Sequence, residues 1–270
     1  MMTKTLIRTL VATCAALVAG AASATPIYPD FTVDTSALGG GGKLVRFVSN
    51  DISGQYHEQL TFTSATTFVV TLDFVAQGFN YDDTDPSLSK SYSAGQTGLG
   101  ANYNLMAILN GSGTYSTVGG TTTFNLNPGG DLTLSYDQGA NATFTAPAGP
   151  GGTYSINANG DVVTTLATGA AVTGNGSVGC SAPNLCGAFG QETSFALTAA
   201  GSSFFVGPNP FYSLSLQSGQ VEGFPVAAGT TVTSSGSLNA VFAPIPEPGS
   251  LAMMGLALVG FMAVRQRRRS

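Results

Sequence analysis

The stretch QLTFTSATTFVVTLDFVAQ, residues 59–77, contains a clear strand pattern. Leu60 and Phe62 alternate with threonines, and apolar residues then recur at every second position from Phe68 to Phe74. A period of two places successive side chains on opposite faces of a strand, so one face of each segment is apolar. The stretch therefore predicts two strands of an antiparallel sheet.

Similar short segments continue through the body of the chain. They are separated by Gly-Gly, Pro-Gly and Asn-Gly turns, and no internal stretch has a helical period. The pattern predicts an all-β body over residues 25–243, arranged as an antiparallel β-sandwich, with a β-barrel as the alternative. The segments are NYNLMAILNGSGTYS, TTTFNL, DLTLSYD, GDVVTTLAT, SFALTAAGSSFFV, FYSLSLQS and GSLNAVFA.

The first 24 residues, MMTKTLIRTLVATCAALVAGAASA, have the order of a secretory signal. Lys4 and Arg8 precede a short apolar run, and Ala22 and Ala24 supply the small residues that signal peptidase accepts. We expect cleavage after Ala24 and export of the mature chain. A retained membrane helix is the alternative, and the short apolar run disfavours it.

The last residues, PIPEPGSLAMMGLALVGFMAVRQRRRS (244–270), end in an apolar segment and a basic cluster. Residues 249–264 predict a transmembrane helix, which at ~1.5 Å per residue spans only ~24 Å of a ~30 Å hydrocarbon core. By the positive-inside rule the cluster stays cytoplasmic, so the body faces outward from a transient anchor. The cluster, within residues 265–269, consists of Arg265, Arg267, Arg268 and Arg269.

The tripeptide Pro246-Glu247-Pro248 precedes this segment, and the order of tripeptide, apolar helix and arginines resembles the PEP-CTERM sorting signal of Gram-negative bacteria. The resemblance implies that a membrane-embedded exosortase recognises residues 244–270, removes the helix and releases the body toward the exopolysaccharide matrix. Closely spaced prolines keep the backbone extended, which suits a protease or transpeptidase cleft. A stiff stalk on a permanent anchor is the alternative.

Parts of the body also resemble the flocculation-associated PEP-CTERM proteins, namely residues 98–144, 210–224 and 236–251. This resemblance implies an extracellular matrix protein that promotes cell aggregation and floc formation in association with exopolysaccharide. The alternative is a carbohydrate-binding, lectin-like surface module that grips sugars through exposed tyrosines; the absence of Trp weighs against it.

The charge of the processed body excludes one class of partner. Once both ends are removed, Lys43, Arg46 and Lys90 face thirteen acidic residues, which gives a formal charge of −10. A sparse acidic surface does not attract phosphate backbones or anionic lipid, so we expect no nucleic-acid partner.

The processed body contains few residues whose side chains could react or bind a metal ion. Cys180 and Cys186 stand close together in an exported chain and predict a local disulfide. The acidic cluster of Asp82, Asp83 and Asp85 predicts a solvated turn, with a Ca²⁺ site as the alternative because Ca²⁺ takes several oxygen ligands.

The single histidine, His57, has no nucleophile motif beside it. We expect it on a strand surface, and we expect no catalytic residues and no enzymatic activity in this chain.

Overall fold

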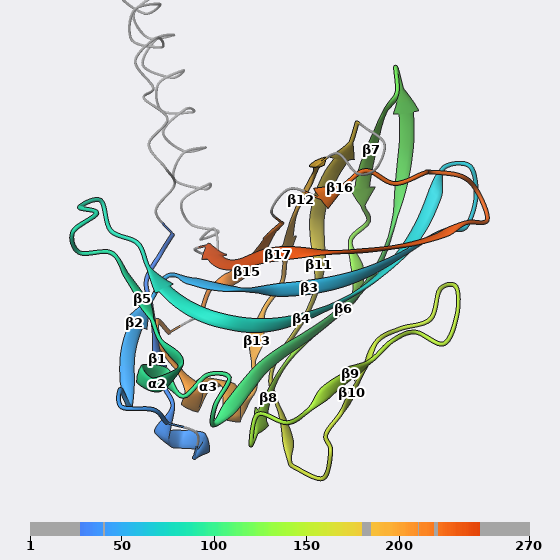
Figure 1. Ribbon diagram of the computed structural model, residues 1–270. Helices are drawn as coiled ribbons and strands as arrows, with labels where there is room; N and C mark the ends of the chain where they lie inside the picture. Colours follow the sequence, from blue (N-terminus) through green and yellow to red (C-terminus); the bar gives the residue numbers. More distant parts are fainter. Residues whose placement is uncertain (1–27, 40, 180–184, 210, 219–220, 244–270) are drawn as a thin grey trace, which may run out of the picture.

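The computed structural model describes residues 28–39, 41–179, 185–209, 211–218 and 221–243, and strands dominate its regular structure (Figure 1). The prediction of an all-β, mainly antiparallel body is confirmed. The described helices are short: η1 (Ser36–Leu38), α2 (Ala94–Thr97) and α3 (Ala199–Phe204). The strands are β1 (Phe31–Asp34), β2 (Arg46–Ser49), β3 (Asp51–Phe62), β4 (Thr67–Tyr81), β5 (Lys90–Tyr92), β6 (Tyr103–Val118), β7 (Thr121–Leu126), β8 (Gly129–Gln138), β9 (Thr143–Thr145), β10 (Ser155–Asn157), β11 (Val163–Val178), β12 (Leu185–Thr193), β13 (Ala196–Leu197), β14 (Phe205–Gly207), β15 (Ser213–Ser218), β16 (Val221–Glu222) and β17 (Thr231–Ala243).

The long strands form one sheet that closes on itself. β3 pairs with β4, β4 with β6, and β6 with both β7 and β8, which follow one another along the same side of β6. β11 pairs with β7 and β8 from their other side and also with β12. β12 pairs with β15, β15 with β17, and β17 with β3, so the antiparallel pairing returns to its starting strand.

The closed pairing corresponds to the barrel alternative and not to the two separate sheets of a sandwich. The apolar alternation in the sequence specifies which face of each strand is buried, but both arrangements bury the same face. In Figure 1, β3, β4 and β17 run across β11 and β12 at a large angle. Side chains from both sets of strands share one core, which includes Leu72 of β4 and Leu166 of β11.

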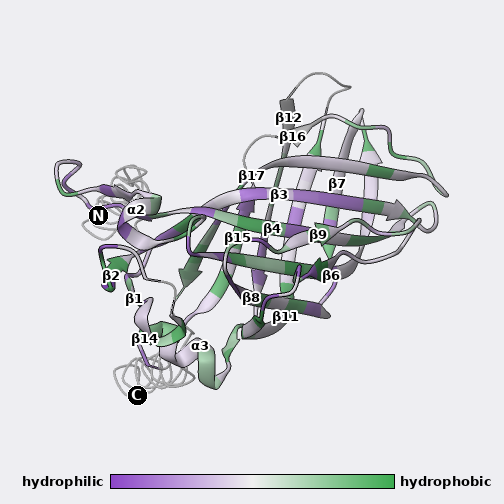
Figure 2. Ribbon diagram, turned by 60° about the horizontal axis from the view of Figure 1, so that its bottom comes forward, coloured by the Kyte–Doolittle hydropathy of each residue, from purple (hydrophilic) through white to green (hydrophobic). Residues whose placement is uncertain are grey.

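Residues 59–77 form the end of β3, a turn and most of β4, as predicted. Phe62 pairs with Phe68 across the turn. The Ser64 hydroxyl oxygen accepts hydrogen bonds from the backbone N–H groups of Thr66 and Thr67 at 3.2 and 3.1 Å, which fixes the reversal. Figure 2 shows β3 as a hydrophilic strand beside a more hydrophobic β4. β3 therefore carries polar residues although its inner face must be buried.

One end of the closed sheet is packed with phenylalanine rings. The small sheet β14-β1-β2 lies there together with α3 (Figure 1). The Phe31 ring meets Phe242 of β17 edge-on with centroids 4.9 Å apart, and Phe205 lies 6.0 Å from Phe31. Edge-on aromatic pairs add about 0.5–1.5 kcal/mol each beyond the burial of their area, so this end is tightly held.

The β9–β10 pair lies outside the closed sheet. The Gly151 N–H donates to the Thr61 hydroxyl of β3 at 2.9 Å, and the Tyr154 N–H donates to the Thr71 hydroxyl of β4 at 3.2 Å. Both threonines lie on the outer faces of their strands and are buried. The segment around β9 and β10 therefore covers part of the outer surface of β3 and β4.

The described residues include no helix that is long and apolar enough to span a membrane. The predicted signal peptide, residues 1–24, and the predicted transmembrane helix, residues 249–264, lie outside the described ranges.

Candidate functional site

A groove of about 810 Å³ lies between the outer face of the closed sheet and the β9–β10 pair. Strands β3, β4 and β17 contribute its floor, and residues 142–146 together with Tyr154 form a wall. The segment 223–225, between β16 and β17, lines it as well. The groove thus combines polar strand residues with aromatic side chains, among them Phe144, Tyr154 and Phe224.

A histidine and an aspartate form the polar centre of the groove. His57 of β3 lies opposite Asp73 of β4 in the strand register. The His57 Nδ1 atom is 3.0 Å from the Asp73 Oδ1 atom, and the His57 backbone N–H donates to the same oxygen at 3.3 Å. The His57 side chain is 61% exposed whereas that of Asp73 is 3% exposed. The prediction that His57 lies on a strand surface is confirmed, and Asp73 anchors the ring from below.

Burial raises the pKa of Asp73, and the hydrogen bonds and charge of His57 partly oppose that rise. Burial also raises the pKa of Tyr154, so its phenol stays neutral at physiological pH and can donate a hydrogen bond. The groove therefore offers donors and acceptors beside an aromatic wall, a combination suited to neutral polar ligands such as sugars.

A serine also lies next to His57. Ser235 of β17 pairs with His57 in the β3–β17 register and lines the groove. Both residues belong to the described part of the chain, and no hydrogen bond joins their side chains. Among the described residues, Ser235, His57 and Asp73 thus form a row across three strands in which a side-chain contact joins His57 to Asp73.

The acidic cluster predicted from sequence lies elsewhere, in the loop between β4 and β5. Asp83 Oδ1 accepts from the Asp85 N–H at 3.0 Å, and Asp85 Oδ1 accepts from the Ser87 N–H and hydroxyl at 2.9 and 2.7 Å. These local bonds lower the pKa values of Asp83 and Asp85. Asp82 uses its backbone to bind Asn50. Within the described ranges no three acidic, histidine or cysteine side chains are grouped so that they could hold a metal ion. The loop is a turn held by its own hydrogen bonds, and Ca²⁺ binding there stays a prediction.

Other predicted sites fall outside the described residues. Cys180 is one of them, so its disulfide with Cys186 of β12 stays a prediction. The signal-cleavage residues Ala22 and Ala24, the tripeptide Pro246-Glu247-Pro248 and the arginines at 265–269 are likewise outside.

Comparison with known families bears on the end of the chain. A family model described as the PEP-CTERM protein-sorting motif matches residues 244–269. The chain carries a PEP-CTERM sorting motif. The match confirms the predicted resemblance of the chain end to the PEP-CTERM sorting signal. No curated protein and no solved structure matches the chain.

The PEP-CTERM motif implies an exported protein that is held in the membrane for a time and is then processed by an exosortase. Exosortase is therefore a processing partner of this chain. The matched segment follows β17 directly, so the sorting signal begins where the closed sheet ends.

Asp73 and Tyr154 are among the groove residues that were not identified from the sequence. Asp73 could have been found by extending the hairpin register outward from Phe62 and Phe68, because each step back along β3 is one step forward along β4. Tyr154 has no such signal, since the segment around β9 and β10 folds back over strands that are distant in sequence.

Proposed function

We propose that this chain is an extracellular matrix protein that promotes cell aggregation and floc formation together with exopolysaccharide. The observation that carries the proposal is the PEP-CTERM motif at residues 244–269, directly behind an all-β body. In this proposal exosortase cleaves the tail, and the closed sheet is delivered to the surface of a Gram-negative cell. The body acts by contact and not by catalysis.

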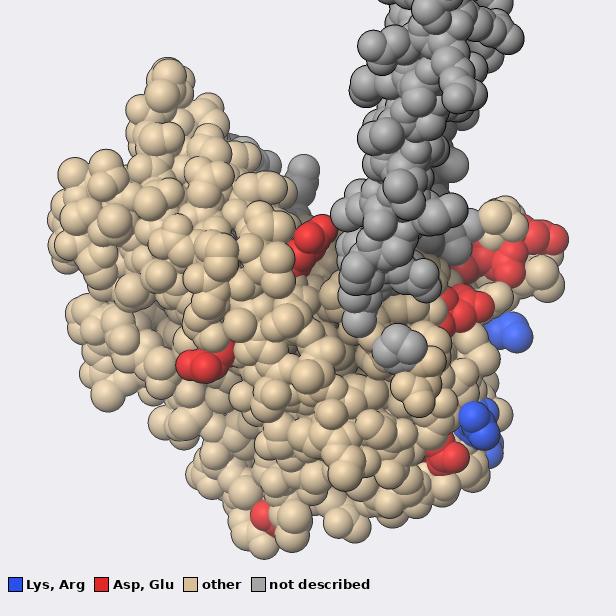
Figure 3. Space-filling view, turned by 180° about the vertical axis from the view of Figure 1, so that it is seen from behind, with Lys and Arg blue, Asp and Glu red and all other residues tan. Residues whose placement is uncertain are grey.

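The surface composition supports this proposal. Figure 3 shows a face on which acidic and basic side chains are few and scattered among uncharged residues. Lys43, Arg46 and Lys90 supply all the Lys and Arg between residues 9 and 264. Hydroxyl and amide groups must therefore provide most of the solvated surface, and these groups exchange hydrogen bonds with sugar hydroxyls without a charge penalty.

A second candidate function is direct, lectin-like binding of a polysaccharide. The groove under the β9–β10 pair favours it, because Tyr154 and Phe144 provide aromatic faces next to the polar His57–Asp73 pair. Its volume of about 810 Å³ falls within the range of small-molecule sites and would hold a few sugar units.

The matrix function can be tested in cells that lack the chain and are complemented with variants. Replacing Pro246, Glu247 and Pro248 together by alanine should leave the tail uncut and abolish floc settling. Pro244→Ala is the matched control, since it removes a neighbouring proline outside the tripeptide. Intact mass of the protein reports cleavage independently of aggregation. Normal flocculation by cells without the chain would refute the matrix function even if processing occurs as expected.

The lectin-like candidate needs a separate measurement of retention on purified exopolysaccharide. His57→Ala should weaken retention without unfolding the protein, because the imidazole is largely exposed. Tyr81→Ala, a tyrosine at the far end of β4, serves as the control. Saturable retention that falls only in the groove variant supports direct binding, whereas equal retention of all three proteins contradicts it.

A further inference from the structure

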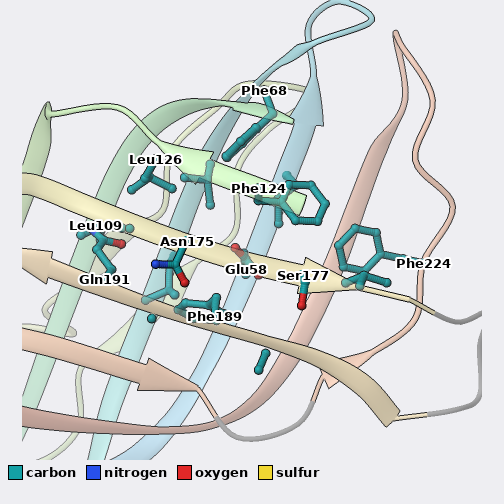
Figure 4. Close-up of a pocket in the computed structure, with 18 residues that line it drawn as sticks. Glu58, Phe68, Leu109, Phe124, Leu126, Asn175, Ser177, Phe189, Gln191 and Phe224 are labelled. Atoms are coloured by element: carbon teal, nitrogen blue, oxygen red, sulfur yellow. The ribbon is translucent and has the colours of Figure 1, made fainter. Parts of the chain in front are cut away.

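A second hollow lies inside the closed sheet, at the end next to the β3–β4 turn (Figure 4). Its free space of about 60 Å³ has room for about four water molecules. Most of its wall is apolar, and the strands around it contribute Leu60, Phe68, Val70, Phe124 and Phe189. Phe224 from the segment after β16 also lines it, with its ring 6.0 Å from that of Phe124.

Glu58 is the one acidic or basic residue in this wall, as far as the described residues go. It lies between Tyr56 and Leu60 on the inner face of β3, and its carboxyl group is enclosed although the residue as a whole is partly exposed. Within the described residues no hydrogen bond or ion pair reaches this carboxyl. Desolvation raises the pKa of Glu58 to about 8, so at neutral pH the group is mostly a neutral acid that can donate a hydrogen bond.

Gln191 of β12 brings a second unsatisfied polar group to the same space. The residue is only 5% exposed, and its Nε2 atom has no hydrogen-bond partner in the described structure. An unpaired buried amide costs about 1–3 kcal/mol. Figure 4 shows Glu58 and Gln191 on the pocket wall among leucine and phenylalanine side chains. Glu58 on β3 and Gln191 on β12 thus provide hydrogen-bond donors that have no acceptor among the described residues. The two strands are not neighbours in the sheet.

Glycines on β11 keep the space open. A side chain at Gly176 would come within 3.0 Å of the Phe189 Cβ atom, and one at Gly174 within 3.2 Å of the Leu126 Cβ atom. Gly174 and Gly176 face the pocket, and the side chains beside them leave little room for a Cβ atom. Backbone therefore forms this part of the pocket wall. The pocket is therefore a consequence of the residues present on β11 and not of a poorly packed loop.

We propose that the pocket binds a small neutral molecule with a short apolar body and one carbonyl or hydroxyl oxygen that accepts a hydrogen bond from the unpaired Gln191 amide, with Glu58 as a second donor of the pocket. The apolar wall covers the body of such a ligand, and its oxygen satisfies the Gln191 amide. A carboxylate ligand would meet an apolar wall that offers it no counter-charge. The proposal is independent of the matrix function, which rests on the sorting motif. It is also independent of the lectin-like candidate, because the pocket and the outer groove have separate polar groups.

Titration calorimetry of the exported protein with acetone, which matches the free space of about 60 Å³, tests the proposal, with acetate and isopropylamine as charged analogues of similar size. We expect saturable binding of the ketone and at least tenfold weaker binding of both analogues, the equivalent of about 1.4 kcal/mol. Preferred binding of the amine would identify a cation site and overturn the proposal, as would the absence of saturable binding by the ketone.

Variants identify the donors. Glu58→Gln keeps a donor and should retain ketone binding within about threefold, whereas Glu58→Leu and Gln191→Leu should each weaken it about tenfold, which corresponds to one lost hydrogen bond. Glu192→Gln, on the adjacent exposed position of β12, is the matched control and should bind as the wild type does. Circular dichroism verifies folding of each variant. Unchanged affinity in folded Glu58→Leu and Gln191→Leu would show that the oxygen is not recognised.

Discussion

Replacing Glu58 by glutamine is expected to remove a pH dependence from the stability of the protein. The ordinary pKa of this glutamate is 4.5, and burial in the interior pocket raises it to about 8. Below pH 4.5 both the folded and the unfolded chain hold the proton. Between the two values the unfolded chain releases its proton while the folded chain keeps it, so rising pH favours unfolding. Above pH 8 the effect levels off.

The magnitude follows from the pKa difference. Each pH unit within this window lowers the free energy of unfolding by up to about 1.4 kcal/mol. From pH 5 to pH 8 the wild type should lose about 3 kcal/mol through Glu58 alone. The amide introduced by Glu58→Gln stays neutral at every pH, so the variant lacks this loss. Tyr56 and Tyr154 sense the charge on Glu58, but their raised pKa values keep both phenols neutral throughout the window.

Urea unfolding of the two proteins at half-unit steps from pH 5 to pH 8 measures the effect. The free energy of the wild type minus that of Glu58→Gln should decline steadily across this range. Burial also raises the pKa values of Asp51 and Asp73, but these groups occur in both proteins and cancel in the difference. A free-energy difference that stays constant with pH would mean that the Glu58 carboxyl ionises freely in solvent. A difference that increases with pH would mean that the carboxyl has a cationic partner. Either result would refute the claim that Glu58 is buried without a partner.

Three further substitutions test packing and the groove. Phe242→Ala should cost about 3–5 kcal/mol and lower the melting temperature by roughly 10 °C, because this buried ring contacts Phe31 and other rings; calorimetry would show a smaller change if the end of the sheet repacks. Gly54→Ala should destabilise by about 3 kcal/mol, since its Cβ would collide with the Val75 carbonyl oxygen, whereas Gly95→Ala has free space and should be neutral in the same thermal assay. His57→Ala should change the unfolding free energy by about 1 kcal/mol, because the imidazole is exposed and the backbone N–H of residue 57 still donates to the buried Asp73 carboxylate; a larger loss in urea would contradict that.

The local pattern of the sequence was sufficient for the strands but not for the closure of the sheet. Residues 59–77 predict both strands of the hairpin, because apolar side chains alternate on each side of a polar turn. The pairing of β11 with β12 joins strands on either side of residues 179–184, and β17 pairs with β3 across most of the chain. Such pairings depend on the geometry of the whole sheet, which alternation alone does not determine.

The two hollows were also only partly accessible from the sequence. In QYHEQL, residues 55–60, strict alternation places Glu58 on the same face as Tyr56 and Leu60, so a glutamate inside the body could have been anticipated. Gln191 could not, because nothing in β12 distinguishes its inner amide from a solvated one. The sorting motif is the opposite case: it is linear, its recognition needs no folding, and the sequence was sufficient to place it.

Under the proposed matrix function, the ring of paired strands has a consequence for how copies of the protein can associate. Crowded β proteins tend to add strands to one another through unpaired backbone N–H and C=O groups, which is the route to amyloid-like fibres. Here each long strand from β3 to β17 in the ring already has a neighbour on both sides, so these described strands leave no extended template for another copy. Under the proposed matrix function, cohesion would then come from side chains on the outer surface, and it would be reversible and open to competition by soluble sugars.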